Sequence, residues 1–262
     1  MPDHSIDAPA EARDARQARS ESSAEHIGRR DWRLGGRTVR RWRERLLAIA
    51  FFSLGLGLLA GALLISMLPV TWGPMAATGV LWIGMLVPVV WAFTRSRPIG
   101  LLRLRPVDLL YGLAIGAALR IAQGWIELAL GEDGALPSYP VIGGNLPSGW
   151  LFTDVVSPGL IAPVIEELFF RAVLVVALFT VFRRQVGSLF AGVIALLGST
   201  GVFVLAHGLQ PSEGAGVVGL IMLGATCSAL VLLTGRIWGA VLVHAVFNLS
   251  FVALAMAGTF AA

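Results

Sequence analysis

Long apolar blocks separated by short polar connections dominate the chain after residue 45. Seven of these blocks are long enough, or nearly long enough, to cross a hydrocarbon layer of ~30 Å as helices that rise about 1.5 Å per residue. The pattern predicts an all-α fold, a polytopic transmembrane helical bundle with about seven spans. The predicted spans are 46–68, 74–94, 107–130, 160–182, 187–208, 216–234 and 237–258.

Two stretches depart from this pattern. Residues 1–45 have no apolar run and are rich in Arg, Ala, Ser and acidic residues, so we expect a disordered cytoplasmic tail. Residues 148–159 are apolar but short, and Pro158 and Pro163 argue against one continuous helix. They are predicted to form a short interfacial or re-entrant eighth helix. The remaining chain, 46–262, forms the transmembrane helical domain.

Composition and charge placement also indicate a multi-pass membrane protein. The chain is 56% hydrophobic and 14% charged, whereas soluble domains are about a quarter charged. All basic residues are Arg, and those outside the predicted spans lie in the N-terminal stretch and at alternate connections, which predicts a cytoplasmic N-terminus in the cell inner (plasma) membrane. Such flanks fit membrane lipid as a partner, and nucleic acid is not expected.

Three ionisable residues interrupt the fourth predicted span in the stretch EELFFR. Glu167 and Arg171 are four residues apart, in the order that favours an ion pair on one helix face. Glu166 is rotated from Glu167 by about 100° and faces a different neighbour. Charged groups are costly in hydrocarbon, so such residues indicate function. Glu166 is predicted to be the free carboxylate; a single structural network of all three residues is the alternative.

The two histidines outside the tail also lie in apolar segments. His207 ends FVLAH, four residues after Phe203, and His244 begins HAVFN, four residues before Asn248. A carboxylate can take a proton from water, imidazoles can bind a metal or donate hydrogen bonds, and an amide can donate to an oxyanion. Together these groups form a hydrolytic set.

The predicted span bounds place the two histidines at different depths. His207 falls near the outer end of its span, whereas His244 lies only ~10 Å into its own span from the opposite side. A shared site therefore requires different bounds, or a connecting helix that is short or tilted.

The three motifs together resemble a known family. EELFFR matches EExxxR, FVLAH matches FxxxH and HAVFN matches HxxxN, in this order on successive predicted helices. Over about 160–250 the chain is similar to the CAAX prenyl protease 2 family of intramembrane proteases, also called the CPBP or Abi family, with lysostaphin-resistance protein A among its relatives. The resemblance implies an endopeptidase that acts on a membrane-associated or lipidated peptide or protein.

The resemblance also implies roles for individual residues. Glu166 would activate the attacking water, helped by His207. A zinc ion on His207, His244 and Glu166 and a metal-free mechanism both remain open. The implied catalytic residues are Glu166, His207, His244 and Asn248, and the implied supporting residues are Glu167, Arg171 and Phe203.

Two other functions remain open from the sequence. One is a non-catalytic binding or immunity protein, and the other is a proton-linked transporter that uses the same ionisable groups. A second polar face, formed by Arg120, Gln123 and Glu127, either lines the same cavity or pairs internally. Asp108 is expected to cap a helix or face water. Small residues at helical spacing, among them Gly112 with Gly116 and Gly235 with Gly239, indicate close helix contacts.

Overall fold

The computed structural model describes residues 31–34, 39, 41–96, 100–131, 133–208 and 214–261. Its long helices are α2 (Glu44–Met67), α3 (Gly73–Arg95), α4 (Pro106–Ala129), α6 (Val176–Ala206), α7 (Gly214–Thr234) and α8 (Trp238–Ala261). Three shorter elements run without a break into α6: η3 (Leu151–Ile161), α5 (Ala162–Glu167) and η4 (Leu168–Val175). Of these, η3 and η4 are π-helical. The predicted all-α fold is confirmed.

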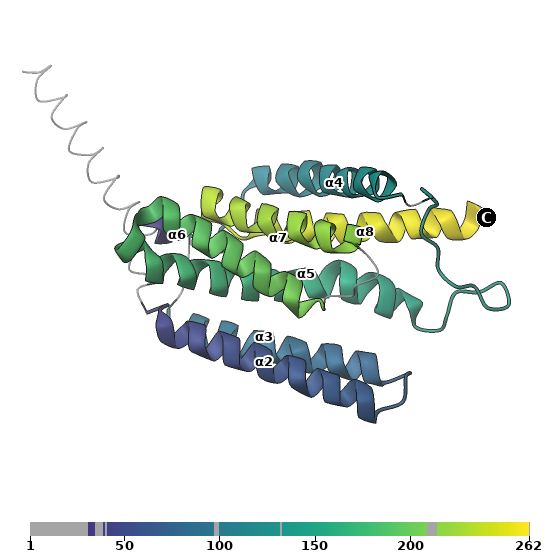
Figure 1. Ribbon diagram of the computed structural model, residues 1–262, viewed down its shortest axis with the longest axis horizontal. Helices are drawn as coiled ribbons and strands as arrows, with labels where there is room; N and C mark the ends of the chain where they lie inside the picture. Colours follow the sequence, from purple (N-terminus) through teal and green to yellow (C-terminus); the bar gives the residue numbers. More distant parts are fainter. Residues whose placement is uncertain are drawn as a thin grey trace, which may run out of the picture.

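Six helices in the described ranges are long and apolar enough to cross a membrane. One of them, Leu151–Ala206, has 56 residues and is broken at Gly187, where φ is 79° and ψ is 172°. Glycine adopts this conformation readily because it has no Cβ atom. Figure 1 shows the chain reversing direction in α6, so the two arms on either side of Gly187 correspond to the fourth and fifth predicted spans.

The prediction of a separate short helix before the fourth span is wrong, because η3 continues directly into α5. In a π-helix each N–H bonds to the carbonyl five residues earlier, and Ala162 donates to Ser157 in this way. The next residue, Pro163, has no N–H, which leaves the carbonyl of Pro158 without a donor in its own helix. The side-chain amide of Asn248 on α8 donates to that carbonyl instead, at 2.8 Å.

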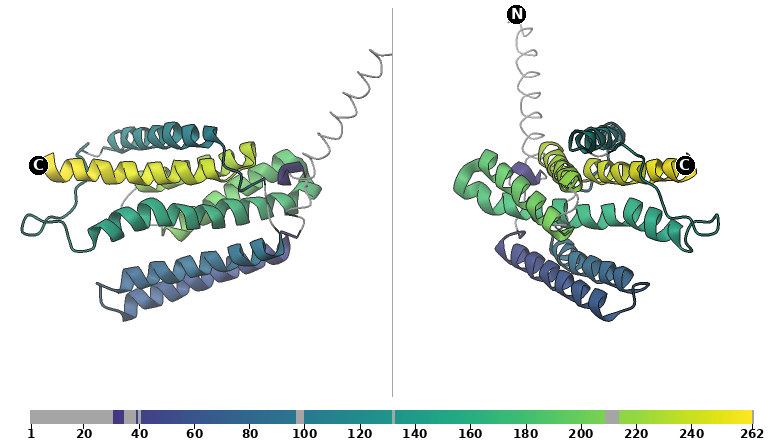
Figure 2. Two further views of the ribbon diagram at one scale, coloured as in Figure 1. Left: turned by 180° about the vertical axis from the view of Figure 1, so that it is seen from behind. Right: turned by 45° about the vertical axis from the view of Figure 1, so that its right-hand side comes forward.

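The helix that runs from η3 to the first arm of α6 lies at the centre of the bundle. Figures 1 and 2 show the α2–α3 hairpin on one side of it and α7, α8 and α4 on the other. Every residue from Phe169 to Ala177 is fully buried. Large apolar side chains such as Phe52 on α2 and Ile83 on α3 are exposed instead. An apolar outer surface of this kind fits a hydrocarbon environment.

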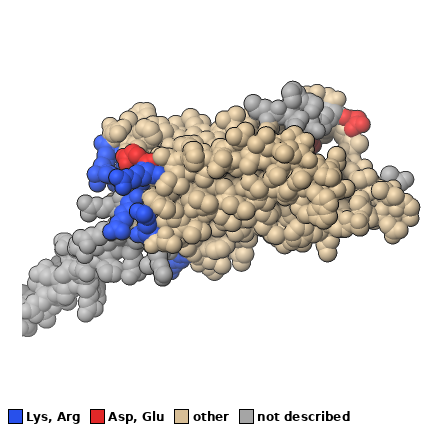
Figure 3. Space-filling model, turned by 90° about the horizontal axis from the view of Figure 1, so that it is seen from below, with Lys and Arg blue, Asp and Glu red and all other residues tan. Residues whose placement is uncertain are grey.

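Arginines gather at one end of the bundle. The start of α2, the connection from α3 to α4, the reversal at Gly187 and the turn between α7 and α8 all lie there, because successive helices alternate in direction. Figure 3 shows Arg side chains at this end of the visible face and a long uncharged surface along the helices. Assignment of this end to the cytoplasm stays a prediction.

Residues 1–30 lie outside the described part of the chain, so the expectation of a disordered tail there stays a prediction. Closer to the bundle, the side chains of η1 residue Trp32 and of Val39 and Trp42 are buried. The indole Nε1 of Trp32 donates to the carbonyl of Gly235 at 3.2 Å. The predicted tail boundary at residue 45 is therefore too late. The error arose because isolated aromatic residues in a polar stretch carry no periodic signal.

Helices α4 and α8 approach closely at Gly112 and Gly116. A Cβ atom built on Gly116 would lie 2.8 Å from the Cβ of Val246 and 2.9 Å from the carbonyl oxygen of Val243. The close contact predicted for this pair is present. Gly235, by contrast, follows α7 in the turn before α8 with φ 71°, so its role there is conformational.

Gly116→Leu is expected to lower the free energy of unfolding by about 1–3 kcal/mol, because the added side chain forces α4 and α8 apart. Thermal unfolding of the detergent-solubilised protein measures the effect. Gly124→Leu on the same helix is the control, because nothing lies within 4 Å of a Cβ atom built there. Equal unfolding temperatures for the two variants would contradict the packing.

Asp108 ties the start of α4 to the turn between α7 and α8. Its buried carboxylate accepts the backbone N–H of Arg105 at 2.8 Å. It also accepts Nη2 of Arg236 at 2.7 Å and Nε at 3.2 Å. The hydrogen bond to Asp108 raises the pKa of Arg236, so its guanidinium stays charged. The prediction that Asp108 caps a helix is confirmed.

Asp108→Asn is expected to cost about 1.5–3 kcal/mol of stability, the usual range for hydrogen bonds to charged groups. The substitution removes the charge that holds Arg236 and weakens the cap of α4. Chemical or thermal unfolding reports the loss, and Asp133→Asn, at an exposed position outside the helices, serves as the control. A variant as stable as the control would show that the ion pair contributes nothing.

Candidate active site

The two adjacent glutamates lie at the end of α5 and are both buried, but their surroundings differ. Oε1 of Glu167 lies 3.1 Å from Nη1 of Arg171 and 2.9 Å from Nδ1 of His244. Oε2 of Glu166 is a buried atom with no hydrogen-bond partner in the described part of the chain. The i and i+4 ion pair expected from the sequence is therefore present, and Glu166 points to a different set of neighbours.

Arg171 is held in place by several groups at once. Its side chain is fully inaccessible, and Nη2 donates to the carbonyl of Gly224 on α7 at 3.3 Å. Its guanidinium carbon lies 4.6 Å from the ring centroid of Phe203. A desolvated cation over an aromatic face is attracted by the ring quadrupole. Arg171 thus fixes the carboxylate of Glu167, which in turn orients the ring of His244.

The two imidazoles converge on Glu166 through the same ring atom. Nδ1 of His207 lies 2.9 Å from the carbonyl of Phe203. Because a carbonyl only accepts, this nitrogen carries the proton and Nε2 is directed elsewhere. Nε2 of His207 lies 3.6 Å from Oε2 of Glu166, and Nε2 of His244 lies 3.9 Å from the same oxygen. These distances are too long for direct hydrogen bonds.

The different depths expected for His207 and His244 are wrong, because the predicted bounds treated the fourth and fifth spans as equal in length. Figure 1 shows the reversal in α6 lying farther out than the ends of α7 and α8. The returning arm after Gly187 therefore starts beyond its neighbours and ends inside the bundle at Ala206. His207 follows at the level of His244, and its side chain remains 31% exposed.

The structure does not bring every polar candidate to this centre. Arg120 donates to Gln123 at 3.0 Å and to the backbone carbonyl of Phe247 at 2.8 Å. Gln123 donates to Glu127 at 2.8 Å. This face of α4 therefore pairs internally and with α8, which was one of the two alternatives. Asn248 points to the carbonyl of Pro158, and its amide has a second N–H that this bond does not use.

A zinc ion on His207, His244 and Glu166 stays a prediction. Two ligands of one tetrahedral zinc ion are about 3.3 Å apart, as follows from bonds of about 2.0–2.1 Å. The separations from Glu166 to the two imidazoles are larger, 3.6 and 3.9 Å. Within the described ranges, no group of three or more His, Cys, Asp and Glu side chains is spaced to hold a metal ion.

Two contributors to the site carry no recognisable signal in the sequence. The carbonyl of Gly224 receives Arg171, and the carbonyl of Pro158 receives Asn248. Both are backbone atoms, and their role depends on which helix faces them. Pro163 is the one sequence feature that indicates a free carbonyl at Pro158, because Pro163 lacks the N–H that would bond to this carbonyl in a π-helix.

The fold and this centre define a membrane-embedded helical bundle with a buried carboxylate between two imidazoles. Comparison with protein families agrees: residues 148–250 match the family model of the type II CAAX prenyl endopeptidase Rce1-like proteins. The resemblance predicted from the three motifs is therefore confirmed over these residues. No curated protein and no solved structure matches the chain.

Proposed function

We propose that the protein is an intramembrane endopeptidase that hydrolyses a peptide bond of a membrane-associated substrate with water activated by Glu166. One observation carries the proposal. Oε2 of Glu166 is buried, has no hydrogen-bond partner in the described part of the chain, and lies 3.6 and 3.9 Å from two imidazole nitrogens. A water molecule fits such separations, since it can lie about 2.8 Å from each polar atom.

In the proposed reaction the water donates one hydrogen bond to Glu166 and the other to an imidazole Nε2. Glu166 takes the proton as the water oxygen attacks the carbonyl carbon of the substrate. The C–N bond then breaks, and the leaving nitrogen takes the proton from Glu166, which yields a carboxylic acid and an amine. The unused N–H of Asn248 is proposed to donate to the oxyanion. Nδ1 of His244 carries a proton toward Glu167, so its Nε2 donates to the oxyanion only in the doubly protonated ring.

The surroundings of the site support a substrate that comes from the membrane. Glu166, Glu167 and His244 are buried within the bundle, whereas the side chain of His207 is partly exposed and marks the open side. Exclusion of bulk water strengthens the electrostatic interactions on which the reaction depends. The family name makes a prenylated C-terminal peptide the first substrate to test.

Purified protein reconstituted in liposomes tests the proposal directly. It is incubated with a quenched farnesylated CAAX peptide, with the same peptide lacking the lipid, and with a membrane-spanning peptide. We expect cleavage of at least one peptide, with the broken bond identified by product mass. Elemental analysis and chelators, applied to the same sample, test the zinc prediction.

Failure of the proposal has two recognisable forms. Binding of a peptide without cleavage, equal in wild type and Glu166→Gln, supports the non-catalytic alternative. Proton flux across the liposome membrane that depends on Glu166, again without cleavage, supports the transporter. Stoichiometric zinc that is lost together with cleavage in His207→Ala would replace the metal-free mechanism with a metalloprotease.

A further inference from the structure

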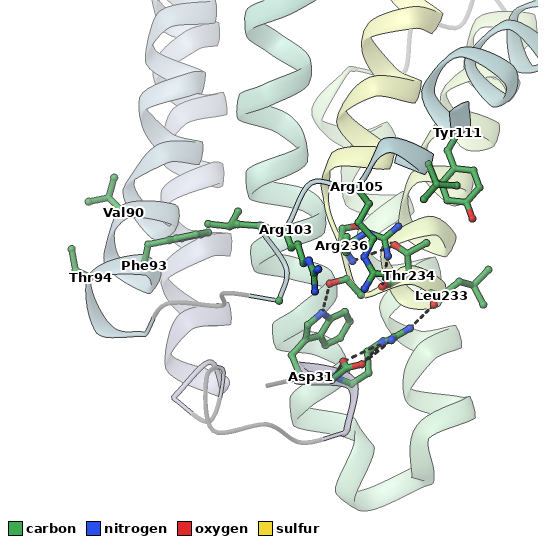
Figure 4. A pocket seen from close by; sticks show the side chains of 16 residues that line it. Asp31, Val90, Phe93, Thr94, Arg103, Arg105, Tyr111, Leu233, Thr234 and Arg236 are labelled. Carbon is green, nitrogen blue, oxygen red and sulfur yellow. Dashed lines mark hydrogen bonds and ion pairs between the residues drawn. The ribbon is translucent and has the colours of Figure 1, made fainter. Parts of the chain in front are cut away.

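A large open cavity lies at the arginine-rich end of the bundle, away from the glutamates. Its volume is about 1570 Å³. Apolar residues line it on α3, with Val90 and Phe93, and on α4, with Val107. Figure 4 shows Arg103, Arg105 and Arg236 gathered across the cavity from Val90 and Phe93. The cavity therefore joins an apolar surface to a cationic one.

Two of the four arginines that line the cavity are already paired. The side chain of Arg33 donates to both carboxylate oxygens of Asp31, from Nε at 3.1 Å and from Nη2 at 2.7 Å. Burial raises the pKa of Asp31, but the hydrogen bonds from Arg33 and its positive charge outweigh burial and hold the pKa below its ordinary value. Arg236 is paired with Asp108 in the same two-pronged way. These pairs shape the wall and add no net charge.

Arg103 and Arg105 supply the remaining charge. Both are exposed, and no acidic side chain in the described ranges forms an ion pair with either. Four arginines against two aspartates leave two positive charges at the cavity. Guanidinium groups present planar forks of donors that match the oxygens of a phosphate.

We propose that this cavity binds the headgroup of an anionic phospholipid. The phosphate lies on Arg103 and Arg105, and the upper acyl chains lie against Val90 and Phe93. Ordinary small-molecule pockets are about 300–1000 Å³, so a cavity of about 1570 Å³ is far too large for a lone phosphate ion. The lipid is also the anion that is abundant beside a span, and basic pockets between spans recognise such headgroups.

The test uses the full chain in a neutral detergent, with short-chain phosphatidylglycerol as the probe. The lipid is expected to raise the unfolding temperature of the wild type, and phosphatidylcholine is expected to have little effect. Arg103→Gln with Arg105→Gln should weaken the apparent affinity for phosphatidylglycerol by about 30-fold, because each arginine near a membrane surface contributes about fivefold. Arg45→Gln with Arg184→Gln is the matched control, since both residues are exposed and lie outside the cavity.

Three results would overturn the proposal. The wild type could show no stabilisation by phosphatidylglycerol. The two double variants could lose the same affinity, which would indicate general attraction to the arginine-rich end. Inorganic phosphate at the same concentration could stabilise the wild type as strongly as the lipid, which would indicate a free anion. The proposal is independent of the protease assignment, because none of these residues contacts Glu166 or the imidazoles in the described structure.

Discussion

Glu166→Gln is expected to lower the rate of peptide-bond cleavage by about 10²–10⁴-fold, the usual contribution of general acid–base catalysis. The carboxamide has nearly the shape of the carboxylate but carries no charge and cannot take a proton from water. Glu167 is committed to Arg171 and His244, through the same oxygen.

The measurement is the initial rate on the best peptide found for the wild type, in the same liposomes. Glu127→Gln is the matched control: it removes a carboxylate from a membrane span, but that carboxylate pairs with Gln123 on α4 and not with the imidazoles. The control should retain activity. Unfolding temperatures of both variants should stay close to the wild type. Substantial cleavage by Glu166→Gln would remove Glu166 from the role of base.

Sequence reasoning succeeded where a local rule was sufficient. Apolar block length predicted the helical bundle, and four-residue spacing predicted the pair of Glu167 with Arg171. A close helix contact at Gly112 and Gly116 was predicted in the same way, although its partner α8 was not. Each of these predictions depends on the geometry of one helix, which short stretches of sequence determine.

Other features depend on which helices meet, and a single sequence did not reveal them. The reversal at Gly187 extends beyond the neighbouring helix ends, and this alone places His207 beside His244. The helix continues past Pro163 because Asn248, more than eighty residues later, donates to the carbonyl of Pro158. Long-range contacts of this kind depend on how the whole bundle packs. The sequence therefore predicted the site residues, but it did not predict that His207 and His244 lie at the same depth in the bundle.

Glu167→Leu is expected to destabilise the protein by about 3–5 kcal/mol, the cost of leaving one partner of a buried ion pair without the other. The guanidinium of Arg171 would keep its hydrogen bond to the carbonyl of Gly224 and its cation–π contact with Phe203. Its charge would nevertheless lose the carboxylate of Glu167 while the side chain remains fully inaccessible to solvent. Thermal or chemical unfolding in detergent measures the loss. Cleavage should also fall, because Nδ1 of His244 loses the acceptor that orients its ring.

The double variant Glu167→Leu with Arg171→Met separates these two consequences. Replacing both charges by apolar groups removes the unpaired cation, and such replacements of buried ion pairs are often neutral or stabilising. The double variant should therefore recover much of the stability that the single variant loses, while cleavage stays low because His244 remains without its acceptor. Recovery of stability and cleavage together would show that Glu167 acts only through the fold. No recovery of either would show that the two residues are not energetically coupled.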